Sequence, residues 1–180
     1  MRVFVAIDPS DAARDALESL QDHIKVGRLT DPETYHITLA FLGDQSDAIL
    51  DGFHEALESI NLSPFTLQLR GLGTFGAKSP KVVWAGLEPN SDLDRLHGKV
   101  RGAARQAGIE LPRERFRPHV TLARFGDRID LTELERLKSF LERFNGFPSP
   151  PFEIQSFRLY QSILRSDGAI HEPLAEYALG

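Results

Sequence analysis

The alternation of apolar and polar positions predicts a series of short strands and amphipathic helices. Short apolar runs at residues 2–7 and 81–86 predict strands. Each run leads into Ser and Asp residues, which are favourable helix N-caps because their side-chain oxygens accept the free N–H groups of the first turn. Further along, apolar residues recur at the three- and four-residue spacing of one buried helix face. They are Leu131, Leu134, Leu137, Leu141 and Phe144.

The chain contains an internal repeat. Residues 36–43, HITLAFLG, match residues 119–126, HVTLARFG, at five of eight positions. Each copy continues into a helix-like stretch and then into a strand-like segment that opens with Ser63 or Ser149. The two apolar runs described above extend the match upstream. The offsets of 79, 83 and 86 residues drift only slightly, as loop insertions between two copies of one unit would produce.

The repeat predicts the fold class. Each copy reads strand–helix–strand–helix–strand, and residues 157–164 and 171–179 predict a closing hairpin. We expect an α+β fold in a single domain, residues 1–180, with two pseudo-symmetric lobes of about 1–76 and about 80–180. Each lobe is expected to be a small antiparallel sheet with helices on its outer face, and an active-site groove is expected between the sheets.

The glycine-rich segment GLGTFG, residues 71–76, does not have the features of a phosphate-binding loop. It lacks the lysine and the following helix that such loops use. A turn between strands is therefore predicted here.

The repeated motif places a histidine and a threonine together in both halves. Side chains alternate across a strand, so His36 shares a face with Thr38, and His119 with Thr121. A polar pair has no packing reason to recur on equivalent strands. If an approximate twofold axis relates the halves, both imidazoles flank one groove. The same alternation predicts that Phe41 lies on the opposite, apolar face of its strand.

Two imidazoles and two hydroxyls around one space suit phosphodiester chemistry. With an unperturbed pKa of about 6.5, one histidine can take a proton from water while the other gives one to a leaving oxygen. The threonine hydroxyls can donate hydrogen bonds to the phosphate oxygens. A lone His-x-Thr on a strand is usually structural, but its duplication favours a functional role. A zinc site would need a further carboxylate or imidazole beside the two histidines.

Composition restricts the partners. The chain has no cysteine, which excludes disulfides and thiolate chemistry and suits a reducing compartment. Its formal net charge is −5, whereas proteins that coat nucleic acid are usually basic. Binding to RNA would therefore use a small footprint such as an end. The basic residues that could form this footprint cluster in one stretch, and for the first two of them a solvated charged loop is an equal alternative. They are Arg113, Arg115, Arg117, Arg124 and Arg128.

The N-terminal segment predicts no contact with a membrane. Its apolar run is too short for a signal peptide or a membrane span and is followed at once by acidic residues. We expect a cytoplasmic protein that acts as a monomer.

The paired motif resembles that of the two-histidine phosphoesterases. The segments RVFVAID, FRPHVTLARF and LYQSIL are similar to those of the RNA 2′,3′-cyclic phosphodiesterase branch, also described as 2′-5′ RNA ligases. The resemblance implies hydrolysis of a 2′,3′-cyclic phosphate on an RNA end or nucleotide to a 2′-phosphate, without metal or cofactor. It implies that His36 donates a proton to the leaving 3′ oxygen, that His119 accepts one from water, and that Thr38 and Thr121 hold the phosphate.

The resemblance also implies substrate contacts for Arg124 and Phe4. Arg124 points away from His119 by simple alternation, so it requires a bulge to face the groove. Phe4 would offer a surface to the terminal base, with a core position as the alternative. The chain departs from its relatives at Leu29, where tryptophan is common, and at His171, where an aromatic residue is frequent.

Three alternatives stay open from the sequence. The same site run in reverse is a 2′-5′ RNA ligase. A module that only binds RNA ends or nucleotides could keep the groove without its chemistry. A metal-dependent hydrolase is the third. Base preference and the physiological RNA substrate are not predicted by the sequence.

Overall fold

In the computed structural model, which describes residues 1–180, polar side chains cap the predicted helices. The helices are α1 (Asp11–Gln21), α2 (Asp47–Glu58), α3 (Ser91–Gln106) and α4 (Leu131–Phe144). Ser10 and Ser46 cap the first two, whereas Asn90 caps α3 in place of the Ser and Asp that follow it. Asp130 and Glu133 form a reciprocal capping box on α4. None of the four combines the length and the apolar character that crossing a bilayer requires.

The buried face of α4 is narrower than the periodicity predicts. Leu137 and Phe140 are buried, and Leu141 and Phe144 are half-buried. Leu131 is 79% exposed, so its predicted place on the buried face is wrong. It is the first residue of the helix, whereas the buried residues Leu137 and Phe140 lie further along it.

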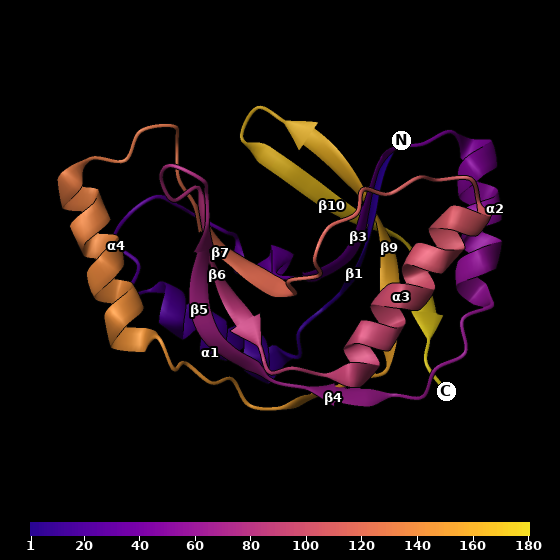
Figure 1. Cartoon of the computed structure of the whole chain (residues 1–180), viewed down its shortest axis with the longest axis horizontal. Coiled ribbons are helices and arrows are strands. Elements are labelled where there is room, and N and C mark those ends of the chain that lie inside the picture. Colours follow the sequence, from indigo (N-terminus) through magenta and orange to yellow (C-terminus); the bar gives the residue numbers. More distant parts are fainter.

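The strands form two four-stranded antiparallel sheets and one small pair, which confirms the α+β class (Figure 1). The first sheet has the order β10 (Gly168–Ala178), β9 (Ser156–Arg165), β1 (Arg2–Ile7), β3 (Ile37–Asp44). The second has the order β2 (Arg28–Leu29), β7 (His119–Arg124), β6 (Val82–Leu87), β5 (Leu69–Phe75). The small pair is β4 (Phe65–Leu67) with β8 (Phe152–Ile154), and a 3₁₀ turn, η1 (Pro32–Thr34), precedes β3.

Each large sheet takes strands from both halves of the sequence. β5 of the first half pairs with β6 of the second, and β9 of the second pairs with β1 of the first. β4 and β8 pair antiparallel with Thr66 opposite Glu153, as expected where a local twofold axis relates two copies. The halves therefore exchange their last strands, and the lobes do not follow the sequence boundary near residues 76–80.

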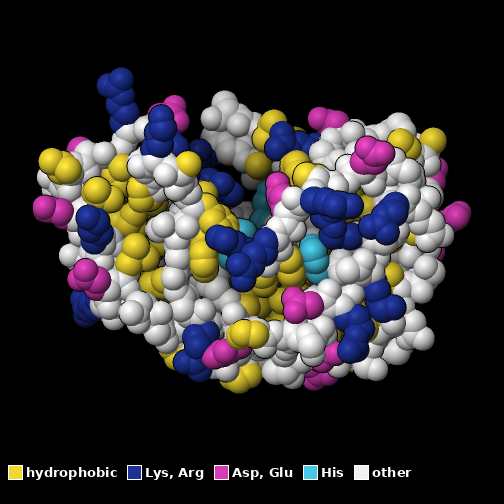
Figure 2. Space-filling view, in the orientation of Figure 1, with side chains coloured by type: hydrophobic (Ala, Val, Ile, Leu, Met, Phe, Trp, Pro, Cys, Tyr) yellow, Lys and Arg dark blue, Asp and Glu magenta, His cyan; other side chains and the backbone are white.

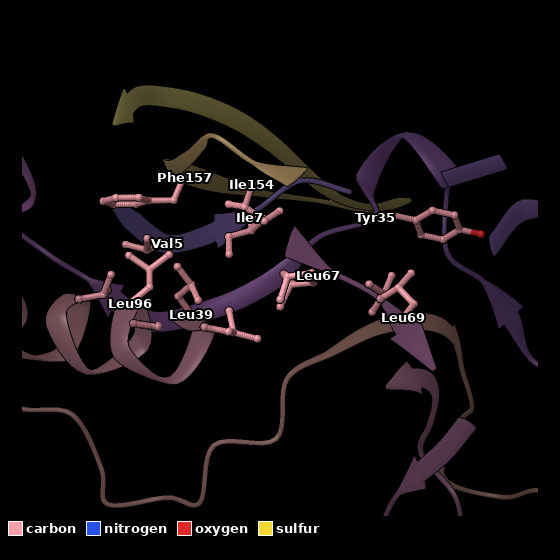
Figure 3. Packing of buried hydrophobic residues seen from close by; sticks show 14 of the residues in the cluster. Val5, Ile7, Tyr35, Leu39, Leu67, Leu69, Leu96, Ile154 and Phe157 are labelled. Atoms are coloured by element: carbon pink, nitrogen blue, oxygen red, sulfur yellow. The ribbon is translucent and has the colours of Figure 1, made fainter. Parts of the chain in front are cut away.

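The interior is shared by the two sheets. Forty buried apolar residues form one cluster, so no polar layer separates the lobes. Figure 3 shows part of it, with Leu96 of α3 beside Val5 and Leu39 of the first sheet. Leu69 of the second sheet belongs to the same cluster. The buried faces of both sheets therefore fix the relative position of the strands that carry the two motifs.

The glycine-rich segment forms most of β5 and is not the turn that its composition predicts. Gly73 pairs with Trp84 of β6. A Cβ atom at Gly73 would lie 2.3 Å from the indole ring, so only glycine lets Trp84 lie across β5. The centroid of the Trp84 ring is in turn 5.9 Å from that of His119. Gly73 thus makes room for an aromatic neighbour of one motif histidine.

Candidate active site

Bulges at equivalent places change the direction of the side chains that follow both motifs. The pairing of β3 with β1 skips Leu39, the third residue after His36. The pairing of β7 with β6 skips Leu122, the third residue after His119. An extra unpaired residue interrupts the alternation of faces, so the residues beyond it turn to the other side.

The bulge in β7 brings Arg124 to the groove. Gln21 of α1, which is 4% exposed, donates hydrogen bonds from its amide to the carbonyl oxygens of Leu122, at 2.9 Å, and Thr30, at 2.7 Å. These bonds satisfy the bulged backbone. Arg124 lines the same cavity as His36, whereas strict alternation pointed it away from the motif histidines. The bulge that this arginine requires is therefore present.

The equivalent bulge in β3 exposes Phe41. Its side chain is 48% exposed, so the prediction that it packs on the apolar face is wrong. The Phe41 ring lies parallel to that of Phe4, with centroids 6.5 Å apart. The guanidinium of Arg2 lies 5.0 Å from the centroid of the Phe41 ring, a cation–π arrangement.

Phe4 is buried, which corrects the expectation that it offers a surface to a base. It is 3% exposed, and its ring is surrounded by those of His36, Tyr160 and His171 at centroid distances of 5.0, 5.3 and 4.9 Å. Almost no face of the ring is left for a ligand. Phe4 instead packs against His36, the residue immediately before β3.

The two motif histidines are tethered in the same way. Nδ1 of His36 lies 2.8 Å from the carbonyl oxygen of Thr34, and Nδ1 of His119 lies 2.8 Å from that of Arg117. A carbonyl oxygen only accepts, so each Nδ1 carries the hydrogen and donates it. Nε2 of each ring is then left to take up or release a proton.

Burial favours the neutral form of both imidazoles. It is the largest cause that lowers the pKa of His36 and of His119 below 6.5, and in each case the bond to the carbonyl partly opposes it. The surrounding charges then differ. Asp8 raises the pKa of His36, although His171 and His119 lower it, whereas Arg124 lowers the pKa of His119.

Asp8 is fixed beside the first histidine by two side chains of β9. The hydroxyl of Tyr160 donates to its carboxylate at 2.7 Å, and the guanidinium of Arg158 does so at 2.7 Å. Burial raises the pKa of Tyr160 to about 12, so the phenol keeps its proton for this bond. No local pattern in the sequence points to Asp8, because its two partners lie 150 and 152 residues further along.

A cavity of about 630 Å³ lies between the two sheets, within the size range of small-molecule sites. His36 and Thr121 line it from opposite lobes, together with Arg124 and with His171 of β10. His119 is close enough for its charge to lower the pKa of His36. Figure 2 shows histidine side chains in the central hollow and Lys and Arg side chains along its border.

Thr38 and His171 complete the surroundings of the groove. Thr38 is half-buried on β3 and does not line the cavity. The His171 ring lies edge-on to that of His36, with centroids 5.2 Å apart. The sequence marked His171 only as a departure from its relatives, and the pairing of β10 with β9 brings it to the groove. No three His, Cys, Asp or Glu side chains converge in a group that could hold a metal ion.

The two-lobed fold and the paired motifs define the two-histidine phosphoesterase class that the sequence resembles. The family sequence model of the 2′-5′ RNA ligase superfamily matches residues 8–163 of this chain. This chain belongs to that superfamily.

Named relatives extend over most of the chain. It is 34% identical to an RNA 2′,3′-cyclic phosphodiesterase of Aeropyrum pernix over 83% of this chain and 84% of the relative. It is 29% identical to one of Archaeoglobus fulgidus over 97% and 98%. E. coli LigT complexed with 3′-AMP superposes with a TM-score of 0.76 at 26% identity, covering 99% of this chain and 96% of that one.

Proposed function

We propose that this protein is an RNA 2′,3′-cyclic phosphodiesterase that hydrolyses a terminal 2′,3′-cyclic phosphate to a 2′-phosphate by general acid–base catalysis. The observation that carries the proposal is the pair of equivalently tethered histidines, each with Nε2 free, from the two lobes. His36 lines the cavity between the sheets, and His119 lies close enough for its charge to act on His36, although it does not itself line that cavity. The names of the relatives and the 3′-AMP complex of E. coli LigT support this substrate class. Because one chain supplies both histidines, we propose that it acts as a monomer.

In the proposed reaction, protons enter and leave through the two histidines. Neutral His119 accepts a proton from water as the water oxygen forms a bond to phosphorus. Protonated His36 gives a proton to the 3′ oxygen as the bond between that oxygen and phosphorus breaks. The products are a 2′-phosphate and a 3′-hydroxyl. Joining the cyclic phosphate to a 5′-hydroxyl uses the same groups, with the 5′ oxygen in place of water forming the bond to phosphorus, and dilute water favours hydrolysis.

The charges around the groove bear on the two roles to different degrees. Asp8 favours the protonated form of His36, as a proton donor requires, but the charge of His171 has a larger effect in the opposite direction. Arg124 favours the neutral form of His119, as a proton acceptor requires. The hydroxyls of Thr38 and Thr121 and the guanidinium of Arg124 would stabilise the charge that develops on the non-bridging phosphate oxygens.

A hydrolysis assay with excess chelator tests the proposal. The purified protein should convert 2′,3′-cyclic AMP to 2′-AMP, identified by chromatography against 3′-AMP, and EDTA should leave the rate unchanged. The reaction should need no metal because the two histidines carry both protons. Loss of activity on chelation would support a metal-dependent hydrolase. Binding of 2′-AMP without turnover of the cyclic substrate would support a nucleotide-binding module.

The pH dependence of hydrolysis should be bell-shaped. Both histidine pKa values lie below 6.5 in the free protein, so the state with one proton on the pair is most populated below pH 6.5. The maximum of kcat/KM, which reports the free protein, is therefore expected below pH 6.5. The bound phosphate anion raises both pKa values, so the maximum of kcat should lie at higher pH. A flat profile across neutral pH would contradict a pair of histidines.

A further inference from the structure

The segment between α3 and β7 is anchored to α3 by its aromatic and carbonyl groups. The ring of Phe116 stacks on that of His97, with centroids 3.7 Å apart and planes 4° from parallel. The guanidinium of Arg101 donates a hydrogen bond to the carbonyl oxygen of Pro112 at 2.8 Å. Although residues 111–118 form no helix or strand, these contacts fix their position.

Three arginines alternate along this anchored segment. Arg113, Arg115 and Arg117 are exposed, and none of them forms an ion pair. Phe116 stacks on His97 of α3, whereas the side chains of Arg115 and Arg117 on either side of it are exposed to solvent. In extended backbone, alternate side chains lie roughly 6.5–7 Å apart. This is comparable with the separation of successive phosphates along an extended single strand of RNA.

The arginine segment leads directly into the active-site groove. The carbonyl oxygen of Arg117 accepts the hydrogen bond that orients His119, two residues further on. Figure 2 shows basic side chains along the border of the central hollow. The chain as a whole carries a formal net charge of −5, whereas residues 111–118 hold three arginines and one exposed glutamate, Glu114, a local net charge of +2. A polyanion would therefore be attracted here and repelled by much of the remaining surface.

We propose that Arg113, Arg115 and Arg117 bind the phosphates of the nucleotides that precede the cyclic end of the RNA. The assignment rests on the proposed function, because it places the terminal phosphate at the histidines and runs the strand outward along the arginines. A guanidinium fits this role because it can form two parallel hydrogen bonds to a phosphate. The small footprint suits recognition of an RNA end.

Equilibrium binding of the reaction product separates this inference from the catalytic proposal. The probe is a fluorescein-labelled RNA tetranucleotide that ends in a 2′-phosphate, measured by fluorescence anisotropy, with 2′-AMP as competitor. The test variant is Arg113→Gln/Arg115→Gln. The matched control is Arg136→Gln/Arg143→Gln, which removes the same charge from the border of a second cavity, of about 850 Å³, beside α4. Thermal melting verifies that both variants are folded.

The test variant should bind the tetranucleotide about tenfold or more weakly than the control, since it loses two phosphate contacts. Each lost contact should also reduce the salt dependence of log K by roughly 0.7, a change that a merely structural effect would not produce. The ratio of tetranucleotide to 2′-AMP affinity should fall in the test variant alone.

Three outcomes would overturn the assignment. They are equal weakening by the two double variants, an unchanged salt slope, or equal binding of a glutamate peptide of the same charge. None of these outcomes depends on turnover. Failure of the wild-type protein to hydrolyse 2′,3′-cyclic AMP would instead contradict the catalytic proposal, whatever the binding data show.

Discussion

Replacing either His36 or His119 with alanine is expected to reduce kcat for hydrolysis of 2′,3′-cyclic AMP by at least about 100-fold, the usual cost of losing a positioned acid or base. Each imidazole supplies a separate proton transfer, so neither can replace the other in one turnover. The measurement is steady-state hydrolysis with product quantified by chromatography. His23→Ala is the control, because His23 is exposed and lies outside the cavity between the sheets.

The double variant should lose little more than the worse single variant, because groups that act together in one step are not additive. Additive losses would indicate two independent effects. The roles can also be separated with a nucleoside phosphodiester that has a 4-nitrophenol leaving group, which departs without a proton. His36→Ala should regain activity on this substrate relative to His119→Ala. Equal losses on it would contradict the assignment of His36 as the proton donor.

Much of this arrangement could be predicted from sequence because the repeat keeps its local signals. The helices begin where polar caps precede periodic apolar residues, as Ser10 and Asp130 show. The His-x-Thr pairs stand out because they occur at equivalent places in two copies. Local signals of this kind are strong enough to order the elements and to identify the class.

The bulges could not be predicted, because a bulge depends on how two strands pair and not on one strand's residues. Leu39 and Leu122 look like ordinary core positions, yet both are skipped by the neighbouring strand. The same pairings relate Val5 to Val83, an offset of 78 residues, where matching the apolar runs suggested 79. A difference of one residue places every side chain of a strand on the other face.

The exchange of strands between the lobes could not be predicted from the sequence either. Nothing in the composition of β5 or β9 says which copy of the repeat it will join. That exchange brings Tyr160 of the second half beside Phe4 and Asp8 of the first. It therefore explains why Phe4 is buried and which side chains hold Asp8, whereas the pairing of Ile7 with Ile37 within the first half brings Asp8 near His36. Contacts between residues this distant in sequence follow from topology, which local pattern does not determine.

Arg124→Gln should give the second-largest loss, roughly 100-fold in kcat, the cost typical of removing one donor that stabilises transition-state charge. The bulge at Leu122, held by Gln21, puts this guanidinium in the cavity with His36. Arg128→Gln is the matched control, since Arg128 is exposed and lies outside that cavity.

The pH profile shows whether Arg124 also acts on the proton acceptor. Because Arg124 lowers the pKa of His119, its removal should raise that pKa and move the acidic limb of kcat/KM to higher pH. A lower rate with an unmoved acidic limb would mean that Arg124 contacts the phosphate without affecting His119. An unchanged rate would mean that Arg124 lines the cavity but does not contribute to catalysis. The combination of a lower kcat and a displaced limb is expected only if one guanidinium lies close to both the phosphate and His119.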